Sequence, residues 1–306
     1  MIIKIDPKVD IVFHNLFGSL EHPRLTMSLV NSLLGRVNLP KAVELTVGNP
    51  FQVALYVKQK ESELDILYRD ETNRQVQLEM QIRWHEGLPQ RMLHNWTQLY
   101  QRQLTEGQEY HEHVPAISVW ILDNTHFHDG KWLHVFRCRD EDGGLVLHDD
   151  QCIITIELPT WQKWLASGKE SILDLLNRWL YFLTNAKGTD QDALLSQLVD
   201  PEFKEAVNVI KGYTTEQKLR HAYDMRQNYK RLVNSYIYTG YKQGEEKGLE
   251  KGLELGEEKG ERKERLKLAG KLKAKGMSDE GIMQLTDLAL EDLAELRSQG
   301  DCPRPD

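Results

Sequence analysis

Cysteine is scarce in this chain, with three residues among 306, at positions 138, 152 and 302. An odd number of widely spaced cysteines suits reduced thiols in a cytoplasmic compartment better than a disulfide framework. Long apolar runs are also missing: the longest, from Val114 to Leu122, is far too short to cross a bilayer. The first residues lack a charged and then apolar signal pattern. We therefore expect a soluble cytoplasmic protein that does not enter a membrane.

Positive charge is not in excess either, because the net charge is −8. This argues against a generally basic nucleic-acid coat protein but not against a local basic groove, since binding depends on the contacted phosphates. Glycine-rich phosphate loops, serine nucleophile elbows and cysteine–histidine signatures are missing from the sequence. The pairs His111/His113 and His126/His128 lack a companion cysteine, so scattered surface histidines are favoured over a zinc site.

The most informative stretch runs from Glu61 to Gln81. Its two halves alternate polar and apolar residues with period two, as half-buried strands do. Between them, residues 70–74 are polar and rich in turn formers, which predicts a β-hairpin. If Thr72 is the tip, the numbers of paired residues sum to 144, and Asp65 lies across from Glu79.

Two carboxylates that face each other on antiparallel strands repel by about 0.2–1 kcal/mol. A divalent cation between them reverses the sign of this interaction, and Mg²⁺ prefers oxygen ligands. The pattern alone leaves two interpretations open: a metal site, or the commoner hairpin whose solvated face is acidic. A change of one residue in the turn would place Asp65 on the wrong face.

Around the hairpin, residues 1–158 predict an α/β unit with one mixed sheet, unlike a doubly wound Rossmann pattern. Asp6 and Pro7 predict a helix start, because aspartate caps helices and proline suits their first position. Asp10 then lies near the N-terminal end, where the helix dipole tolerates a carboxylate. Helices are expected over 6–18, 23–34 and 88–104, and strands over 43–47, 51–57, 114–123, 132–137 and 151–158.

Three further regions follow: a helical extension over 159–235, a glycine repeat over 236–265 and a small helical unit over 266–306. Breaks in the extension are expected near Gly188 and Gly212. Its last part carries a basic group that is either a solvated helix face or a phosphate contact: Lys218, Arg220, Arg226, Lys230 and Arg231. The final unit is either two plain packed helices or a minimal helix-turn-helix, and its acidic second helix disfavours phosphate contact.

Glycine recurs at every fourth position from Gly240 to Gly260, with Glu, Lys and Gln between. Each glycine costs a helix about 0.8–1 kcal/mol relative to alanine, while Glu–Lys pairs support it. A flexible charged linker and a helix that joins copies of the chain both remain open.

Four segments then occur in one order: Asp6–Gly18, Leu64–Ile66, Gln77–Gln81 and Gln90–Leu93. Tyr100 and the later Gly-Gln-Glu-Tyr run extend the pattern. Together they resemble the PD-(D/E)XK nuclease family transposases, kin of the recombination-promoting nucleases (Rpn). The resemblance covers about residues 3 to 125, and the glycine-repeat tail also occurs in such proteins.

The resemblance implies a restriction-endonuclease-like core and a Mg²⁺-dependent phosphodiesterase on DNA, with Mn²⁺ as a substitute. It implies that Asp65 and Glu79 bind the metal, with Asp10 as an additional acidic ligand. The implied mechanism is attack of a metal-activated water on a phosphodiester, with the cation neutralising charge on the leaving oxygen. Arg91 would steady a phosphate or pair with a carboxylate.

Gln81 stands where the general family pattern has lysine. Lysine supplies a positive charge that orients the attacking water, whereas glutamine offers a neutral amide; glutamine is nevertheless familiar in this subfamily. We expect a metal-dependent DNA endonuclease, recombination-promoting or associated with a mobile element. Two other classes stay open: a catalytically inactive nuclease fold that binds DNA or protein, and an oligomeric scaffold built around the glycine repeat.

Overall fold

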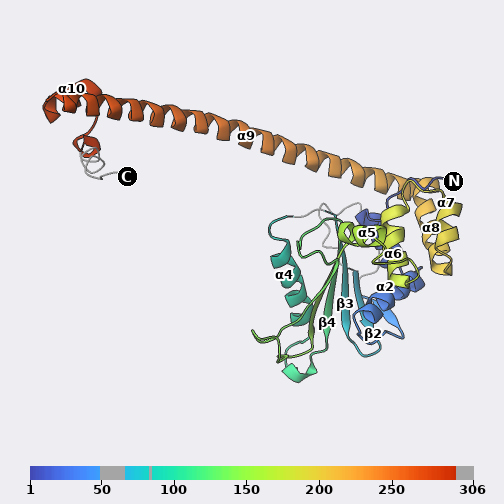
Figure 1. Cartoon of the computed structure of the whole chain (residues 1–306). Coiled ribbons are helices and arrows are strands. Elements are labelled where there is room, and N and C mark those ends of the chain that lie inside the picture. The colour runs from blue at the N-terminus through green and yellow to red at the C-terminus, as the bar shows by residue number, and fades with distance from the viewer. Residues whose placement is uncertain (49–65, 83–84, 294–306) are drawn as a thin grey trace. The chain divides into compact units, whose positions relative to one another are not determined.

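A computed structural model of the chain describes residues 1–48, 66–82 and 85–293 (Figure 1). The chain divides into a first compact unit, Met1–Asn228, and a second unit that begins at Tyr229. Asp65 and the expected strand over 51–57 lie outside the described residues.

A six-stranded mixed sheet forms the centre of the first unit, in the order β1-β2-β3-β4-β6-β5. The pairs β3–β4 and β4–β6 are parallel, and the remaining pairs are antiparallel. This confirms the expected α/β arrangement with one mixed sheet. The strands are β1 (Leu45–Val47), β2 (Ile66–Asp70), β3 (Gln75–Gln81), β4 (Ala116–Leu122), β5 (Leu133–Phe136) and β6 (Gln151–Glu157).

Strands β2 and β3 form the predicted hairpin. Ile66 pairs with Leu78 and Arg69 pairs with Gln75, so the predicted sum of 144 is confirmed for the described pairs. The turn depends on the Asp70 carboxylate, which accepts hydrogen bonds from the Thr72 and Arg74 amides at 2.9 and 3.0 Å. Asn73 occupies the left-handed region with φ of 61°, which asparagine tolerates better than most residues.

Helices cover both faces of the sheet (Figure 1). Helix α4 (Leu88–Gln101) packs Leu88 and Met92 against Trp120 on one face. The other face carries the main core, to which the alternate β4 residues Val119 and Ile121 contribute. Because β4 is buried on both faces, its sequence is an almost continuous apolar run. The other helices of this unit are α1 (Asp10–Phe17), α2 (Pro23–Arg36), α5 (Leu158–Ala166), α6 (Leu175–Asn185), α7 (Gln191–Gln197) and α8 (Pro201–Thr215), and a short 3₁₀ turn spans Tyr110–Glu112.

The expected helix start at Asp6 and Pro7 is wrong, because α1 begins at Asp10. The Asp6 carboxylate accepts a hydrogen bond from the Lys8 amide at 3.0 Å, so it closes a separate turn before the helix instead of capping it. The first helix nevertheless ends before Gly18, as expected.

Three other helix boundaries also differ from expectation. Helix α2 continues through Gly35 to Arg36, and α4 ends at Gln101, three residues before the expected end. Helix α8 passes through Gly212 and the chain breaks only at Glu216, whereas the break expected near Gly188 is present, with a φ of 87° there. A single glycine therefore did not stop a helix whose neighbouring turns pack well.

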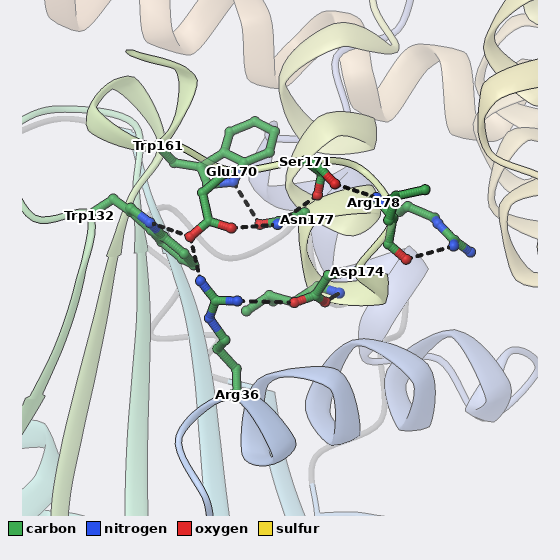
Figure 2. A network of polar contacts seen from close by, with 10 residues as sticks. Arg36, Trp132, Trp161, Glu170, Ser171, Asp174, Asn177 and Arg178 are labelled. Atoms are coloured by element: carbon green, nitrogen blue, oxygen red, sulfur yellow. Dashed lines mark hydrogen bonds and ion pairs between the residues drawn. The ribbon is translucent and has the colours of Figure 1, made fainter. Parts of the chain in front are cut away.

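A polar network around the Glu170 carboxylate ties the loop between α5 and α6 to α2 and to the residue before β5 (Figure 2). Glu170 pairs with Arg36 and accepts hydrogen bonds from Trp132 Nε1 at 3.2 Å and Asn177 Nδ2 at 2.8 Å. Asn177 in turn accepts from Trp161 Nε1 at 2.8 Å. The Glu170 side chain is 7% exposed, so its charge depends on these partners.

Helix α9 (Gln217–Ala274) leads from the first unit into the second and contains the whole glycine repeat. The repeat is therefore helical in this structure. Helix α10 (Asp279–Thr286) begins after Ser278, whose hydroxyl accepts from the Gly281 amide. Within the second unit, Ala269 of α9 packs with Ile282, Leu288 and Leu293. No helix of the described residues has the length and apolar character needed to span a membrane.

Candidate active site

A small polar cavity of about 170 Å³ lies beside the carboxyl end of β3. Parallel strands β3 and β4 bring their carboxyl ends to this same edge, where the Asp123 amide donates to the Gln81 carbonyl at 2.9 Å. The lining comes from α1, β3, α4 and the start of α9: Asp10, His14, Glu79, Met80, Gln81, Arg91 and Arg226.

The β3 residues Glu79 and Gln81 meet Arg91 of α4. Arg91 Nη2 donates to Glu79 Oε1 at 2.7 Å, and Nη1 donates to Gln81 Oε1 at 3.2 Å. The guanidinium also lies over the Trp120 ring, 5.4 Å from its centroid. The Glu79 side chain is 11% exposed, so this charge-assisted contact compensates much of the carboxylate's burial.

Asp10 and Arg226 form the opposite pair. The Asp10 carboxylate accepts from the Ile11 amide at 3.0 Å and forms an ion pair with the Arg226 guanidinium. Both side chains are about four-fifths buried. His14 follows Asp10 by four residues and therefore lies on the same face of α1.

Helix α1 is held in place by Tyr213 of α8, whose hydroxyl donates to the Ile11 carbonyl at 2.9 Å. Burial raises the pKa of Tyr213, with a smaller contribution from Asp10, so the hydroxyl stays protonated and keeps this bond. Lys8, just before α1, pairs with Asp123 after β4, with Nζ–Oδ distances of 2.7 and 2.9 Å. These contacts fix the start of α1, and with it Asp10, against the sheet edge.

The cavity brings together four of the five site residues named from the sequence: Asp10, Glu79, Gln81 and Arg91. The fifth, Asp65, lies outside the described residues, so its position across from Glu79 stays a prediction.

His14, Met80 and Arg226 are the lining residues that the sequence did not assign to the site. For His14 the signal was available, because it follows Asp10 at helical spacing. For Arg226 only a general basic group was visible, because 216 residues separate it from its partner Asp10.

The cavity offers carboxylate and amide oxygens, the ligand type that Mg²⁺ and Mn²⁺ prefer. Within the described part of the chain, no group of three or more His, Cys, Asp or Glu side chains is arranged to enclose a metal ion. Mg²⁺ is commonly held by only one or two carboxylates, with water and substrate oxygens completing its shell. The donor set of Asp10, Glu79 and Gln81 therefore fits a hard divalent cation chemically.

The histidine pairs considered for zinc have other contacts. The His113 ring stacks on Tyr100, with centroids 4.1 Å apart, and Tyr100 donates to Asp150 at 2.9 Å. Desolvation, with the neighbouring Asp150 carboxylate, raises the pKa of Tyr100 to about 12. The His126 amide donates to the buried Glu157 carboxylate at 2.7 Å.

Comparison with protein families gave a match to the PD-(D/E)XK nuclease family transposases over residues 7–240. Comparisons with curated proteins and with solved structures gave no match. The family match covers most of the chain, supports a nuclease-type or mobile-element role and agrees with a mixed sheet flanked by helices. This chain, with its α/β restriction-endonuclease-like fold, belongs to the PD-(D/E)XK nuclease family transposases.

Proposed function

We propose that the protein is a Mg²⁺-dependent endodeoxyribonuclease that hydrolyses phosphodiester bonds in DNA. The observation that carries the proposal is the single cavity in which Asp10, Glu79 and Gln81 meet two arginines, on a chain of a nuclease family. Asp65, predicted to lie across from Glu79, completes the proposed set of acids.

The acids of the cavity would hold the cation. In the structure their two negative charges are balanced by Arg91 and Arg226. When bound among the same oxygens, a divalent cation would supply an activated water and would neutralise charge on the leaving oxygen. Its charge would also reduce the attraction between each carboxylate and its arginine, which makes the guanidinium groups available to phosphate.

Arg91 is the residue that compensates for the neutral amide of Gln81. Its guanidinium contacts both Glu79 and Gln81, so it places a permanent positive charge beside the position where the general family pattern has lysine. Arginine stays protonated throughout the working pH range and presents several donors in a fixed plane. We assign to it the stabilisation of negative charge on the phosphate during hydrolysis.

DNA contact is assigned to the start of α9, which lies in the first unit and carries Lys218, Arg220 and Arg226. Arg226 links this basic group to the cavity. A local group of this kind can bind phosphates although the whole chain is negatively charged, because the salt-dependent affinity comes from the contacted charges.

The test is nicking of supercoiled plasmid by purified full-length protein in Mg²⁺ or Mn²⁺, with EDTA as the metal-free reference. Glu79→Ala and Asp65→Ala should each abolish metal-dependent nicking, because each removes a proposed ligand. Glu106→Ala serves as the control, since this exposed glutamate lies outside the cavity.

The alternatives give different results. Cleavage that persists in both variants would place the chemistry elsewhere and contradict the proposal. DNA binding without cleavage by the wild type would support the catalytically inactive module, and Asp65→Ala would then change no activity.

A second copy of the chain is the proposed partner of α9. The helix exposes bulky side chains beside its glycines, at Tyr236, Ile237, Tyr241, Leu249 and Leu253. Deletion of 236–265 should lower the molecular mass measured by light scattering to that of one chain. An unchanged mass for the deletion protein would rule out association through this segment.

A further inference from the structure

A second cavity, of about 520 Å³, lies at the opposite end of the parallel strands from the candidate active site. It is bounded by the β2–β3 turn at Arg74 and by the amino ends of β4 and β6 at Pro115 and Cys152. Arg74, just before β3, is separated from Gln81 at the end of β3 by seven residue steps, about 23 Å of extended chain. Of the described residues, none lines both cavities.

Buried Arg74 places a positive charge in the wall of this cavity. Its side chain is 8% exposed, and its guanidinium pairs with Asp70 at 2.8 Å and donates to the Pro40 carbonyl at 2.8 Å. Its Nε is buried and has no hydrogen-bond partner within the described part of the chain. This Nε has almost no solvent-accessible area, so a ligand in the cavity would be attracted by the charge of Arg74 and not by a hydrogen bond to Nε.

Three more cations line the same cavity: Lys41, Arg137 and Arg139. Arg137 lies 3.8 Å from the exposed Asp149, too far for a hydrogen bond, and Arg139 makes a long contact of 3.3 Å with the Gly143 carbonyl. Both guanidinium groups therefore retain donors for a ligand.

Two of the acids that face the cavity already have hydrogen-bond or ion-pair partners at close distance. Asp70 is the carboxylate of the β2–β3 turn and pairs with Arg74. Glu71 accepts from the Val43 and Glu44 amides at 3.0 and 3.2 Å, and its own backbone amide together with these two lowers the pKa of its carboxyl group. Among the described lining residues, four positive side chains thus face three negative ones, and two of the three acids have close donors.

The remaining wall is apolar and comes from Leu39, Pro40, Pro115, Ile117 and the buried Cys152. A free inorganic anion would leave this surface exposed to water. A ligand with an anionic group and an apolar ring would cover it, in the size range of small-molecule pockets.

We propose that this cavity binds a phosphate monoester with an aromatic or apolar body, held at the phosphate by Arg74, Arg137 and Arg139. A phosphate monoester matches this group of cations, because it carries a charge of about −1.5 to −2 and three acceptor oxygens at neutral pH. The site is independent of the proposed nuclease chemistry.

Calorimetric titration of full-length protein with phenyl phosphate in EDTA tests the proposal. A Kd of about 0.1–1 mM is expected for a ligand of this size, and inorganic phosphate should bind more weakly because it lacks the ring. Arg137→Gln and Arg139→Gln should each weaken phenyl phosphate about tenfold. Arg139 is exposed and Arg137 has only a 3.8 Å contact with the exposed Asp149, so the variants should fold.

Two control variants separate this cavity from other effects. Arg102→Gln removes an exposed arginine outside both cavities and should leave the affinity unchanged, as should Glu79→Gln at the candidate active site. No binding of phenyl phosphate at millimolar concentration would overturn the proposal. Equal affinity in wild type and the two arginine variants, or equal affinity for inorganic phosphate, would overturn it as well.

Discussion

Arg91 shows how a single side chain can organise the candidate site. It donates to Glu79 and Gln81 and rests on the Trp120 ring, so its position is fixed by β3, β4 and its own helix. Arg91→Ala should lower the plasmid nicking rate by about 10²-fold, because it removes a positioned charge from a partly buried site. Arg91→Lys should retain part of the rate.

A lysine at position 81 distinguishes this charge effect from a loss of structure. In the Arg91→Ala background, Gln81→Lys should restore part of the nicking rate, since it returns a cation to the same side of β3. Circular dichroism spectra of the variants provide the folding control. Nicking at the wild-type rate by Arg91→Ala would remove the assigned role.

The two cysteines of the described residues should differ in reactivity. Cys138 is exposed and Cys152 is buried. Desolvation raises the pKa of the Cys152 thiol, although Arg137 opposes the shift, so fewer thiolates form there at a given pH. In a Cys302→Ser background, Ellman's reagent should modify one thiol rapidly at pH 8, and Cys138→Ser should eliminate this phase.

The pH dependence of stability and of thiol reactivity follows from the raised pKa of Cys152. The folded state disfavours the Cys152 thiolate, so the associated stability is complete below the ordinary thiol pKa of about 8.5 and falls as pH rises above it. The exposed Cys138 should therefore react faster, and the Cys152 rate should rise only at higher pH. Equal rates for both thiols in the native protein would contradict this account.

At the scale of elements, the hairpin was predictable because its signals are local. Strand alternation and turn composition fixed a register that the structure reproduces from Ile66 to Arg69. The start of α1 was not predictable from Asp6 and Pro7, because the same aspartate can cap a helix or close a turn. In this chain the aspartate closes a turn, and Val9 after it packs in the core.

The Glu170 network is an element-scale contact that stabilises the first unit (Figure 2). Glu170→Ala should lower its free energy of unfolding by about 2–4 kcal/mol, because Trp132 and Asn177 lose an acceptor and Arg36 loses its most buried partner. Urea unfolding followed by tryptophan fluorescence measures this, since all seven tryptophans precede residue 229.

Exposed Glu141 provides the matched control, and Glu141→Ala should change the free energy of unfolding by less than about 0.5 kcal/mol. The free energy of unfolding of Glu170→Gln should lie between those of Glu170→Ala and Glu141→Ala, because the glutamine amide keeps one acceptor oxygen. A Glu170→Ala protein as stable as the control would show that the network contributes little.

Helix α9 should gain local stability from alanine. A Cβ added at Gly248 or Gly252 meets no atom within 4 Å, so each substitution should stabilise this part of the helix by about 0.8–1 kcal/mol. Hydrogen exchange of the full-length protein should show slower exchange around both positions. Unchanged or faster exchange would contradict the prediction. Faster exchange would also point to a partner that needs the glycines.

The spacing of the glycines limits how such a partner can bind. Four residues advance about 400° around a helix, so successive glycines are displaced by about 40° and the first and last of the six by about 200°. The glycines therefore wind around α9, and one straight partner helix could contact only some of them.

At the scale of the whole molecule, composition and periodicity were sufficient to predict an α/β unit with one mixed sheet. They did not give the order β1-β2-β3-β4-β6-β5, because strand neighbours depend on long-range pairing. The same dependence on long-range packing explains why the sequence predicted only part of the candidate site. Glu79 and Gln81 lie together on one strand, whereas Arg226 reaches Asp10 only through the packing of α8 and α9 against α1.

The most direct test of the central claim is calorimetric titration of Mn²⁺ into the full-length protein. Wild type should bind Mn²⁺, and Glu79→Gln and Asp10→Asn should each weaken this binding at least tenfold, while Glu106→Gln should not. Mn²⁺ affinity that is the same in wild type, Glu79→Gln and Asp10→Asn would contradict a metal centre at this cavity.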